Sequence, residues 1–370
     1  MSRDGVTIFL GGDVMTGRGI DQIQKHPSDP NLCEAWARSA LEYLDLAEQK
    51  NGAIPRSVDP GYIWGDALGA LDEAGPAVRI INLETAVTDR GDPWPNKGIH
   101  YRMHPDNLDS ITIAKIDCCV LANNHILDWS LPGLVQTLNS LEEVGLVGVG
   151  AGNDVTAAEA PLVIDVPGGR RVVILALGMA SSGIPETWAA ETGRSGVAFS
   201  RTLSSAEVDS VAARVATVAS PGDLVVASIH WGPNWGYQVS SSHWRFARAL
   251  IDRAGVHLVH GHSSHHPLGM EVYRGRLILY GCGDLVNDYE GIRGHEDYRP
   301  DLGFLYLVTV DPTAGQLLQL ELVPVRRRRF RLALASAEER NWLKTTLTHA
   351  GKPMGTSIEA TGEGRLFLRW

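Results

Sequence analysis

Cysteine and long apolar runs are scarce in this sequence. Its 370 residues contain four cysteines, and Cys33, Cys118, Cys119 and Cys282 form no C-x-x-C pair. A disulfide-stapled or thiol-redox fold is therefore not expected, and we predict a reduced, cytoplasmic protein. No stretch approaches 18 apolar residues, and the apolar run at 6–10 is too short for a signal segment, so we expect neither a membrane span nor an export signal.

Positive charge is also in deficit. The chain has 33 Lys and Arg against 43 Asp and Glu, a net charge of -10, which argues against general binding to nucleic acid or anionic membranes. The basic run 326–329 with Arg331 follows a strand-like stretch, and surface ion pairs are its favoured use. We therefore predict no nucleic-acid and no membrane partner, and the oligomeric state is left open.

The remaining composition is that of a globular protein. Hydrophobic residues make up 44% and charged residues 21%, and the length fits one large domain or two ordinary ones. Apolar β-rich runs alternate with amphipathic helical segments, which predicts an α/β architecture with helices layered on sheets. We expect one catalytic domain at residues 1–330, with residues 331–370 forming a C-terminal helix and tail packed on it.

Metal-competent side chains follow the apolar runs where each predicted strand ends. The runs at 6–10, 77–83, 116–121, 224–229, 256–259 and 277–280 are followed by Asp13, Glu84, Asn124 with His125, His230, His262 with His265, and Asp284. In open α/β sheets, ligands bind at this edge. Carboxylate, amide and imidazole groups are metal ligands, so the pattern predicts a metal site.

The same residues lie in six ordered motifs. These are Gly12-Asp13-Val14-Met15, Asn82-Leu83-Glu84-Thr85, Ala122-Asn123-Asn124-His125, His230-Trp231-Gly232, Gly261-His262-Ser263-Ser264-His265 and Tyr280-Gly281-Cys282-Gly283-Asp284. Over residues 6–330 the sequence resembles the poly-γ-glutamate capsule-synthesis (CapA) branch of the calcineurin-like metallophosphoesterases. The resemblance implies a four-layer α/β/β/α sandwich of two mixed sheets. It places metal ligands at Asp13, Glu84, Asn124, His230, His262 and His265, with His125 as an acid/base group beside the metal.

Two positions depart from the wider superfamily. Met15 stands where the first motif has a histidine, and Glu84 stands in place of a bridging aspartate. One or two divalent ions are therefore expected, with Ca²⁺ or Mn²⁺ favoured and Zn²⁺ or iron as alternatives. No motif for pyridoxal phosphate or flavin is evident, so no organic cofactor is expected.

Further candidates surround the predicted ligands. Asp128 could orient His125, or could simply be a carboxylate at a helix N-terminus. His295 lies in the polar loop 284–297, which is either solvated or folded back over the metal. The acid/base candidates are His125, His295, Asp13, Asp128 and Asp284, and the substrate-binding candidates are Lys97, Arg102, Trp231 and Trp235, with core packing as the alternative for the tryptophans.

Three functions remain open. The runs 263–267 and 282–292 resemble a cytoplasmic offshoot of the CapA branch, the lasso-peptide epimerases, which implies metal-dependent inversion of a C-terminal tryptophan in a ribosomal precursor peptide. We favour this reading, with the precursor peptide as partner. The alternative is a metal-dependent phosphoesterase of the CapA type. A non-enzymatic role in capsule assembly ranks third.

Overall fold

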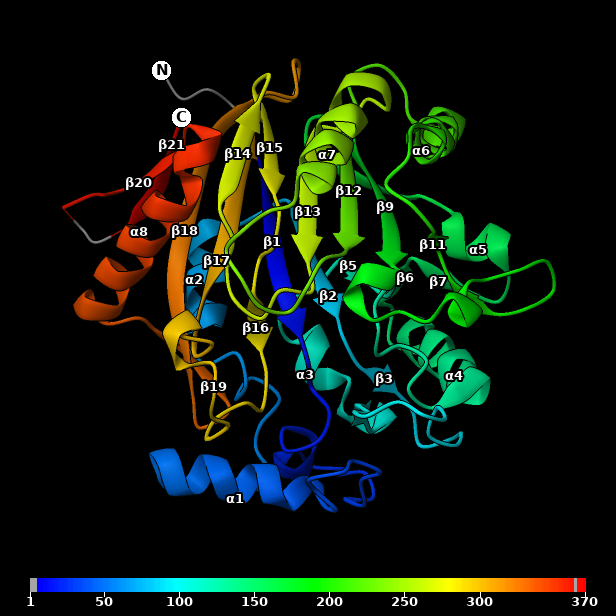
Figure 1. Ribbon diagram of the computed structural model, residues 1–370, viewed down its shortest axis with the longest axis vertical. Coiled ribbons are helices and arrows are strands. Elements are labelled where there is room, and N and C mark those ends of the chain that lie inside the picture. Colours follow the sequence, from blue (N-terminus) through cyan, green and yellow to red (C-terminus); the bar gives the residue numbers. More distant parts are fainter. Residues whose placement is uncertain (1–4, 363–364) are drawn as a thin grey trace.

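The computed structural model describes residues 5–362 and 365–370, and over these residues two mixed β-sheets pack face to face. Helices cover the outer faces of both sheets (Figure 1). The predicted α/β sandwich of two mixed sheets is confirmed.

The first sheet has ten strands and is built around β1. Its order is β20-β21-β18-β17-β1-β2-β5-β6, with β16 beside β1 and β19 beside β18. The bounds are β1 (Val6–Val14), β2 (Val78–Leu83), β5 (Cys118–Val120), β6 (Val147–Val149), β16 (Asp284–Val286), β17 (Leu302–Val310), β18 (Leu317–Arg328), β19 (Arg331–Leu334), β20 (Ser357–Ala360) and β21 (Leu366–Arg369). Strands β2 and β16 run parallel to β1, and β17 runs antiparallel to it.

The second sheet has seven strands. Its order is β11-β9-β12-β13-β15-β14, with β8 beside β9. The bounds are β8 (Leu162–Val166), β9 (Arg170–Met179), β11 (Phe199–Ser200), β12 (Leu224–His230), β13 (Leu258–His262), β14 (Met270–Tyr273) and β15 (Arg276–Leu279). Two small ladders pair β3 (Ala86–Val87) with β4 (Arg102–Met103) and β7 (Ala151–Gly152) with β10 (Gly196–Val197). Strands β1, β12 and β13 point toward the same end of the molecule (Figure 1).

Side-chain alternation along the strands creates the layers. In β1, Ile8 and Leu10 face the second sheet, and Phe9 faces the helices on the other side. In β9, Val173 and Leu175 face the outer helices of the second sheet. Successive strand residues point to opposite faces, so a fully buried strand contributes side chains to the core between the sheets and to the core under the helices. A continuous apolar run predicts this double burial.

Helices of both layers lie against these cores. On the first sheet these are α1 (Ala40–Asn51), α2 (Asp66–Ala74), α3 (Asp109–Thr112) and α4 (Ser130–Glu143), and on the second they are α6 (Ser205–Val218) and α7 (Ser241–Arg253). The short α5 (Val155–Glu159) packs against β7 and β10. Among residues 5–362 and 365–370, no helix combines the length and apolar character needed to cross a membrane.

The C-terminal segment differs from the predicted helix and tail. The proposed boundary at residue 330 cuts the hairpin between β18 and β19, and β21 pairs with β18 in the first sheet. Helix α8 (Ala337–Gly351) begins at the predicted cap, Ser336, and buries Leu343 and Leu347 in the core between the sheets. The described residues of this segment, 331–362 and 365–370, therefore add strands to the first sheet as well as a helix, and strands this short carry too little alternation to be recognised beforehand.

Candidate metal centre

The carboxyl ends of parallel strands from both sheets meet at one place. In the first sheet, Asp13 of β1 is the register partner of Asp284 in β16 and of Asn82 in β2. In the second sheet, His230 of β12 is paired with His262 of β13. Strand direction and register thus bring together residues that are far apart in the sequence.

A glycine allows β16 to close on β1. A Cβ atom at Gly12 would lie 1.8 Å from the carbonyl oxygen of Gly283, so only glycine fits there without displacing the chain. The amide of Asp13 donates to that same carbonyl at 3.1 Å. This close approach places Asp13 and Asp284 side by side.

Two groups of metal-competent side chains share Asp13. One is Asp13 with His230 and His262, and the other is Asp13 with His265 and Asp284. All five residues are buried, and within each group the ligand atoms lie within 4.8 Å of one another. The structure therefore brings four predicted metal ligands together and adds Asp284, which was predicted as an acid/base group.

The protonation properties of this cluster suit a cation. Burial, and then the Asp284 carboxylate, raise the pKa of Asp13 to about 7. Burial, and then His125, lower the pKa of His230, while burial and His230 lower that of His262. Neutral imidazoles offer lone pairs, and crowded buried carboxylates are stabilised by a positive charge, so the donor set fits a divalent metal.

His265 behaves differently from the other two histidines. Burial lowers the pKa of His265, but the Asp284 carboxylate outweighs this and leaves the pKa above its usual value. Its Nδ1 lies 2.9 Å from Oδ1 of Asp284, and its Nε2 lies 2.9 Å from the amide of Asn234.

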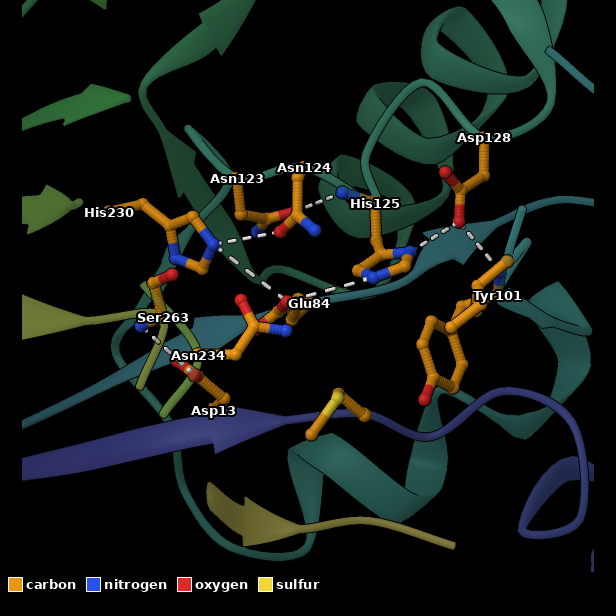
Figure 2. A network of polar contacts seen from close by, with 12 residues as sticks. Asp13, Glu84, Tyr101, Asn123, Asn124, His125, Asp128, His230, Asn234 and Ser263 are labelled. Carbon is orange, nitrogen blue, oxygen red and sulfur yellow. Dashed lines mark hydrogen bonds and ion pairs between the residues drawn. The ribbon is translucent and has the colours of Figure 1, made fainter. Parts of the chain in front are cut away.

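Two predicted ligands lie beside the groups that share Asp13. Oε1 of Glu84 is 3.8 Å from Nε2 of both His125 and His230, and Figure 2 shows Glu84 between these two rings. Oδ1 of Asn124 accepts a hydrogen bond from Nε2 of His230 at 2.8 Å. This bond directs Nδ1 of His230 toward Nδ1 of His262, 2.7 Å away. In the structure Asn124 therefore orients a candidate ligand.

His125 is held by two neighbours. Its Nδ1 lies 2.6 Å from Oδ2 of Asp128, the contact expected from the sequence, while Nζ of Lys97 lies 2.5 Å from Oδ1 of the same carboxylate. Burial lowers the pKa of His125 to about 4 despite the opposing charge of Asp128. The ring is therefore neutral near pH 7, with Nε2 directed toward Glu84 and free to take a proton (Figure 2).

A cavity of about 270 Å³ opens onto these groups. Its walls include Glu84, Lys97, Asn124, His125 and His265. The side chain of Lys97 is 14% exposed, so its ammonium group lies at the cavity wall next to His125. His265 of the metal-competent cluster, the oriented imidazole of His125 and the ammonium group of Lys97 thus line one cavity.

Four of the other predicted residues, Trp231, Arg102, His295 and Trp235, lie outside the cavity at Glu84. Trp231 is 3% exposed and packs against His243, Phe246 and Tyr280, because this residue, directly after the end of β12, faces α7. The guanidinium of Arg102 lies over the ring of Trp129, because β4 directs it away from the cavity. Neither lines the cavity at Glu84, and the core-packing alternative describes Trp231. His295 stacks on Trp235, with 3.8 Å between the ring centroids, in a neighbouring cavity.

Sequence reasoning missed several amides in the site. Asn82 donates to Oδ1 of Asp13 at 2.8 Å, and the backbone amide of Ser263 donates to Oδ2 of Asp13 at 3.1 Å. Asn82 had a signal, since it stands in the Asn82-Leu83-Glu84 motif at a strand end. Asn234 had none, because it lies in a loop whose path depends on packing.

Comparisons with known proteins identify the family of this chain. Residues 7–289 match the family of the bacterial capsule synthesis protein PGA_cap. A probable polyglutamine synthesis accessory protein of Mycobacterium tuberculosis is 46% identical over 356 residues, 96% of this chain and 93% of that protein. The PGA biosynthesis protein CapA of Bacillus subtilis is 27% identical over 289 residues, 78% of this chain and 64% of that protein.

One solved structure similar to this chain is a phosphatase of Mycoplasma pneumoniae. It has a TM-score of 0.47 and 12% identity, and the match covers 88% of this chain and 94% of that one. The family assignment rests on the sequence matches, which extend over the motifs that carry Asp13, Glu84, His125, His230 and His265. This chain belongs to the bacterial capsule synthesis protein family.

Proposed function

We propose that the protein is a metal-dependent phosphoesterase that serves the synthesis of a glutamate-type polymer. The observation that carries the proposal is the pair of ligand groups sharing Asp13, beside the oriented imidazole of His125. The names of the relatives, which refer to polyglutamine and PGA synthesis, support the setting of the reaction.

The donor set constrains the metal. Three imidazoles and two carboxylates surround the shared position, whereas Ca²⁺ takes oxygen ligands almost exclusively. We therefore favour Mn²⁺, iron or Zn²⁺ over the Ca²⁺ considered from sequence. When bound, such an ion supplies Lewis-acid polarisation of the phosphoryl group and lowers the pKa of water.

The side chains supply the remaining steps. Asp128 accepts the Nδ1 proton of His125 in a hydrogen bond, so Nε2 is free to take a proton from water and to return it to the leaving oxygen. Lys97 places a positive charge at the cavity wall, where it stabilises a phosphoryl oxygen.

Hydrolysis of p-nitrophenyl phosphate and bis-p-nitrophenyl phosphate tests the proposal. We expect turnover by Mn²⁺-loaded protein, loss with EDTA, recovery on adding Mn²⁺, and loss in Asp13→Asn. The absence of turnover with either ester at full metal loading would refute it.

The peptide epimerase favoured from sequence is now the second candidate. None of the relatives reported above is named as an epimerase, whereas the capsule and PGA synthesis named for them fits the CapA-type alternative. It keeps one specific observation, which is that two imidazole–carboxylate pairs, His125–Asp128 and His265–Asp284, reach the same cavity. Deuterium incorporation at the Cα of a Trp-ended peptide in D₂O, abolished by EDTA, would favour it.

A further inference from the structure

A second cavity of about 260 Å³ adjoins the metal-binding cavity. The two share the walls formed by Trp36, Ile99, Asn234, His265 and Tyr289. His265 also belongs to one of the ligand groups. A molecule whose reacting atom lies at the metal centre can therefore extend directly into this second cavity.

Rings dominate the second cavity. Its walls include the rings of Trp36, Tyr43, Trp235, His265, Tyr289 and His295. Trp235 and His295 are stacked in parallel, with 6° between their planes. Such walls offer large planar contact surfaces with little side-chain freedom to lose on binding.

Trp36 is unusual because it is exposed and yet held in place. It is 63% exposed, but its indole nitrogen donates to the hydroxyl of Tyr43 at 2.8 Å. Tyr43 in turn donates to the buried carboxylate of Glu34. An exposed indole that is oriented in advance at a cavity rim is typical of a binding surface, because a solvated side chain otherwise samples several rotamers.

The charges in this cavity are already neutralised. Arg18 contributes to the wall, but its guanidinium donates to both oxygens of Asp288, at 3.1 and 2.6 Å, and to Glu34 at 3.1 Å. Among the described residues that line the cavity, the one guanidinium is thus paired with carboxylates, which favours an uncharged ligand group there.

We propose that this aromatic cavity is a substrate subsite for an uncharged planar ring carried by the phosphoester. The proposal rests on the proposed function, because that function places the phosphoryl group at the metal centre. The ring then packs against Trp36 and Trp235 while the ester lies near His265. The substrate class is thus a phosphoester that carries a planar aromatic substituent close to the ester group.

Binding of stable phosphonates tests the subsite without turnover. The probes are 2-phenylethyl-, 2-cyclohexylethyl- and ethylphosphonate, titrated calorimetrically into Mn²⁺-loaded protein. We expect the phenyl compound to bind about tenfold more tightly than the ethyl compound, and more tightly than the cyclohexyl compound of matched size.

Variants assign the preference to the cavity. Trp36→Ala, at a position that is 63% exposed, is expected to reduce the phenyl preference at least about threefold, whereas Trp36→Phe should keep most of that preference. Trp370→Ala is the matched control, because Trp370 is 53% exposed and lies outside the cavity. This variant should leave the preference for the phenyl compound unchanged.

The outcomes separate the two proposals. Equal binding of the phenyl and cyclohexyl compounds, or a full phenyl preference in Trp36→Ala, overturns the planar-ring subsite alone. Failure of all three phosphonates to bind overturns the proposed function and the subsite together. A ring preference in a protein that hydrolyses no ester counts against the function alone.

Discussion

Asp13 and Asp284 are direct register partners across the parallel strands β1 and β16. Burial, and then the charge of Asp284 beside it, raise the free-energy cost of ionising Asp13, and its pKa is raised accordingly. A cation relieves that repulsion. The pairing therefore places Asp284 in one of the two candidate ligand groups that share Asp13.

Removal of the shared carboxylate should abolish both ligand groups. We expect Asp13→Asn to reduce bound metal to near zero, whereas His265→Ala, which leaves Asp13, His230 and His262 intact, should keep part of it. Mass spectrometry of each purified and dialysed variant measures the metal that remains bound. Asp45→Asn on the exposed side of α1 is the control, and wild-type content in Asp13→Asn would contradict the shared-ligand assignment.

Loss of the oriented imidazole should slow chemistry without releasing metal. His125→Ala is expected to lower kcat by about 10²–10⁴-fold, the usual contribution of a general acid/base. Asp128→Asn should lower kcat by a smaller factor, because the imidazole of His125 remains and only the carboxylate that accepts from its Nδ1 is lost. Steady-state kinetics with parallel metal analysis tests this. Metal loss in His125→Ala would instead make this residue a ligand.

Lys97 should act on the phosphoryl group through its charge. Lys97→Met is expected to lower kcat/KM by about 10–100-fold, because an ammonium that contacts a phosphoryl oxygen is lost. Lys97→Arg should retain part of the wild-type kcat/KM, because it keeps the positive charge. Since Lys97 also pairs with Asp128, the pH profile of kcat/KM should be recorded for both variants. Unchanged kcat/KM in Lys97→Met would exclude this role.

His257 should make the fold sensitive to acid. Burial, and then Arg276, lower the pKa of His257 from 6.5 to about 4, and Nδ1 accepts a hydrogen bond from the amide of Val225 at 3.0 Å. His257 binds a proton more readily in the unfolded chain than in the folded one. The contribution of neutral His257 to the free energy of unfolding is therefore complete above pH 6.5 and is lost as the pH falls toward 4. Between pH 7 and pH 5, His257 is expected to lower the free energy of unfolding by about 2 kcal/mol.

Urea unfolding at pH 7 and pH 5 measures this contribution. His257→Gln should lose less of its free energy of unfolding between these pH values than the wild type, whereas His349→Gln, at an exposed position, should follow the wild type. An identical pH dependence in His257→Gln and the wild type would refute the assignment.

Gly12 should tolerate no side chain. Gly12→Ala places a Cβ atom 1.8 Å from the carbonyl oxygen of Gly283, and β16 must move to admit it. We expect a loss of about 3 kcal/mol in the free energy of unfolding, together with weaker metal binding. Gly69→Ala in α2 meets nothing within 4 Å and should be neutral or stabilising. Thermal unfolding of both variants and the wild type measures these changes in the free energy of unfolding.

Much of the site could be predicted from strand ends. Polar residues directly after buried apolar runs lie at the carboxyl edge of the sheets, and parallel direction brings these edges together. Asp13, His230 and His262 follow this rule. The contact between His125 and Asp128 followed from their spacing of three residues on one turn.

The amino-acid sequence by itself determined the layered sheets and the set of metal-competent residues, because apolar runs and the residues that follow them are local properties of the chain. Only the tertiary structure decided which groups meet: Asp284 joined the ligand group, Asn234 reached His265, and Trp231 packed into the core. Those outcomes depend on the register between strands and on loop paths, which are set by contacts between distant parts of the chain.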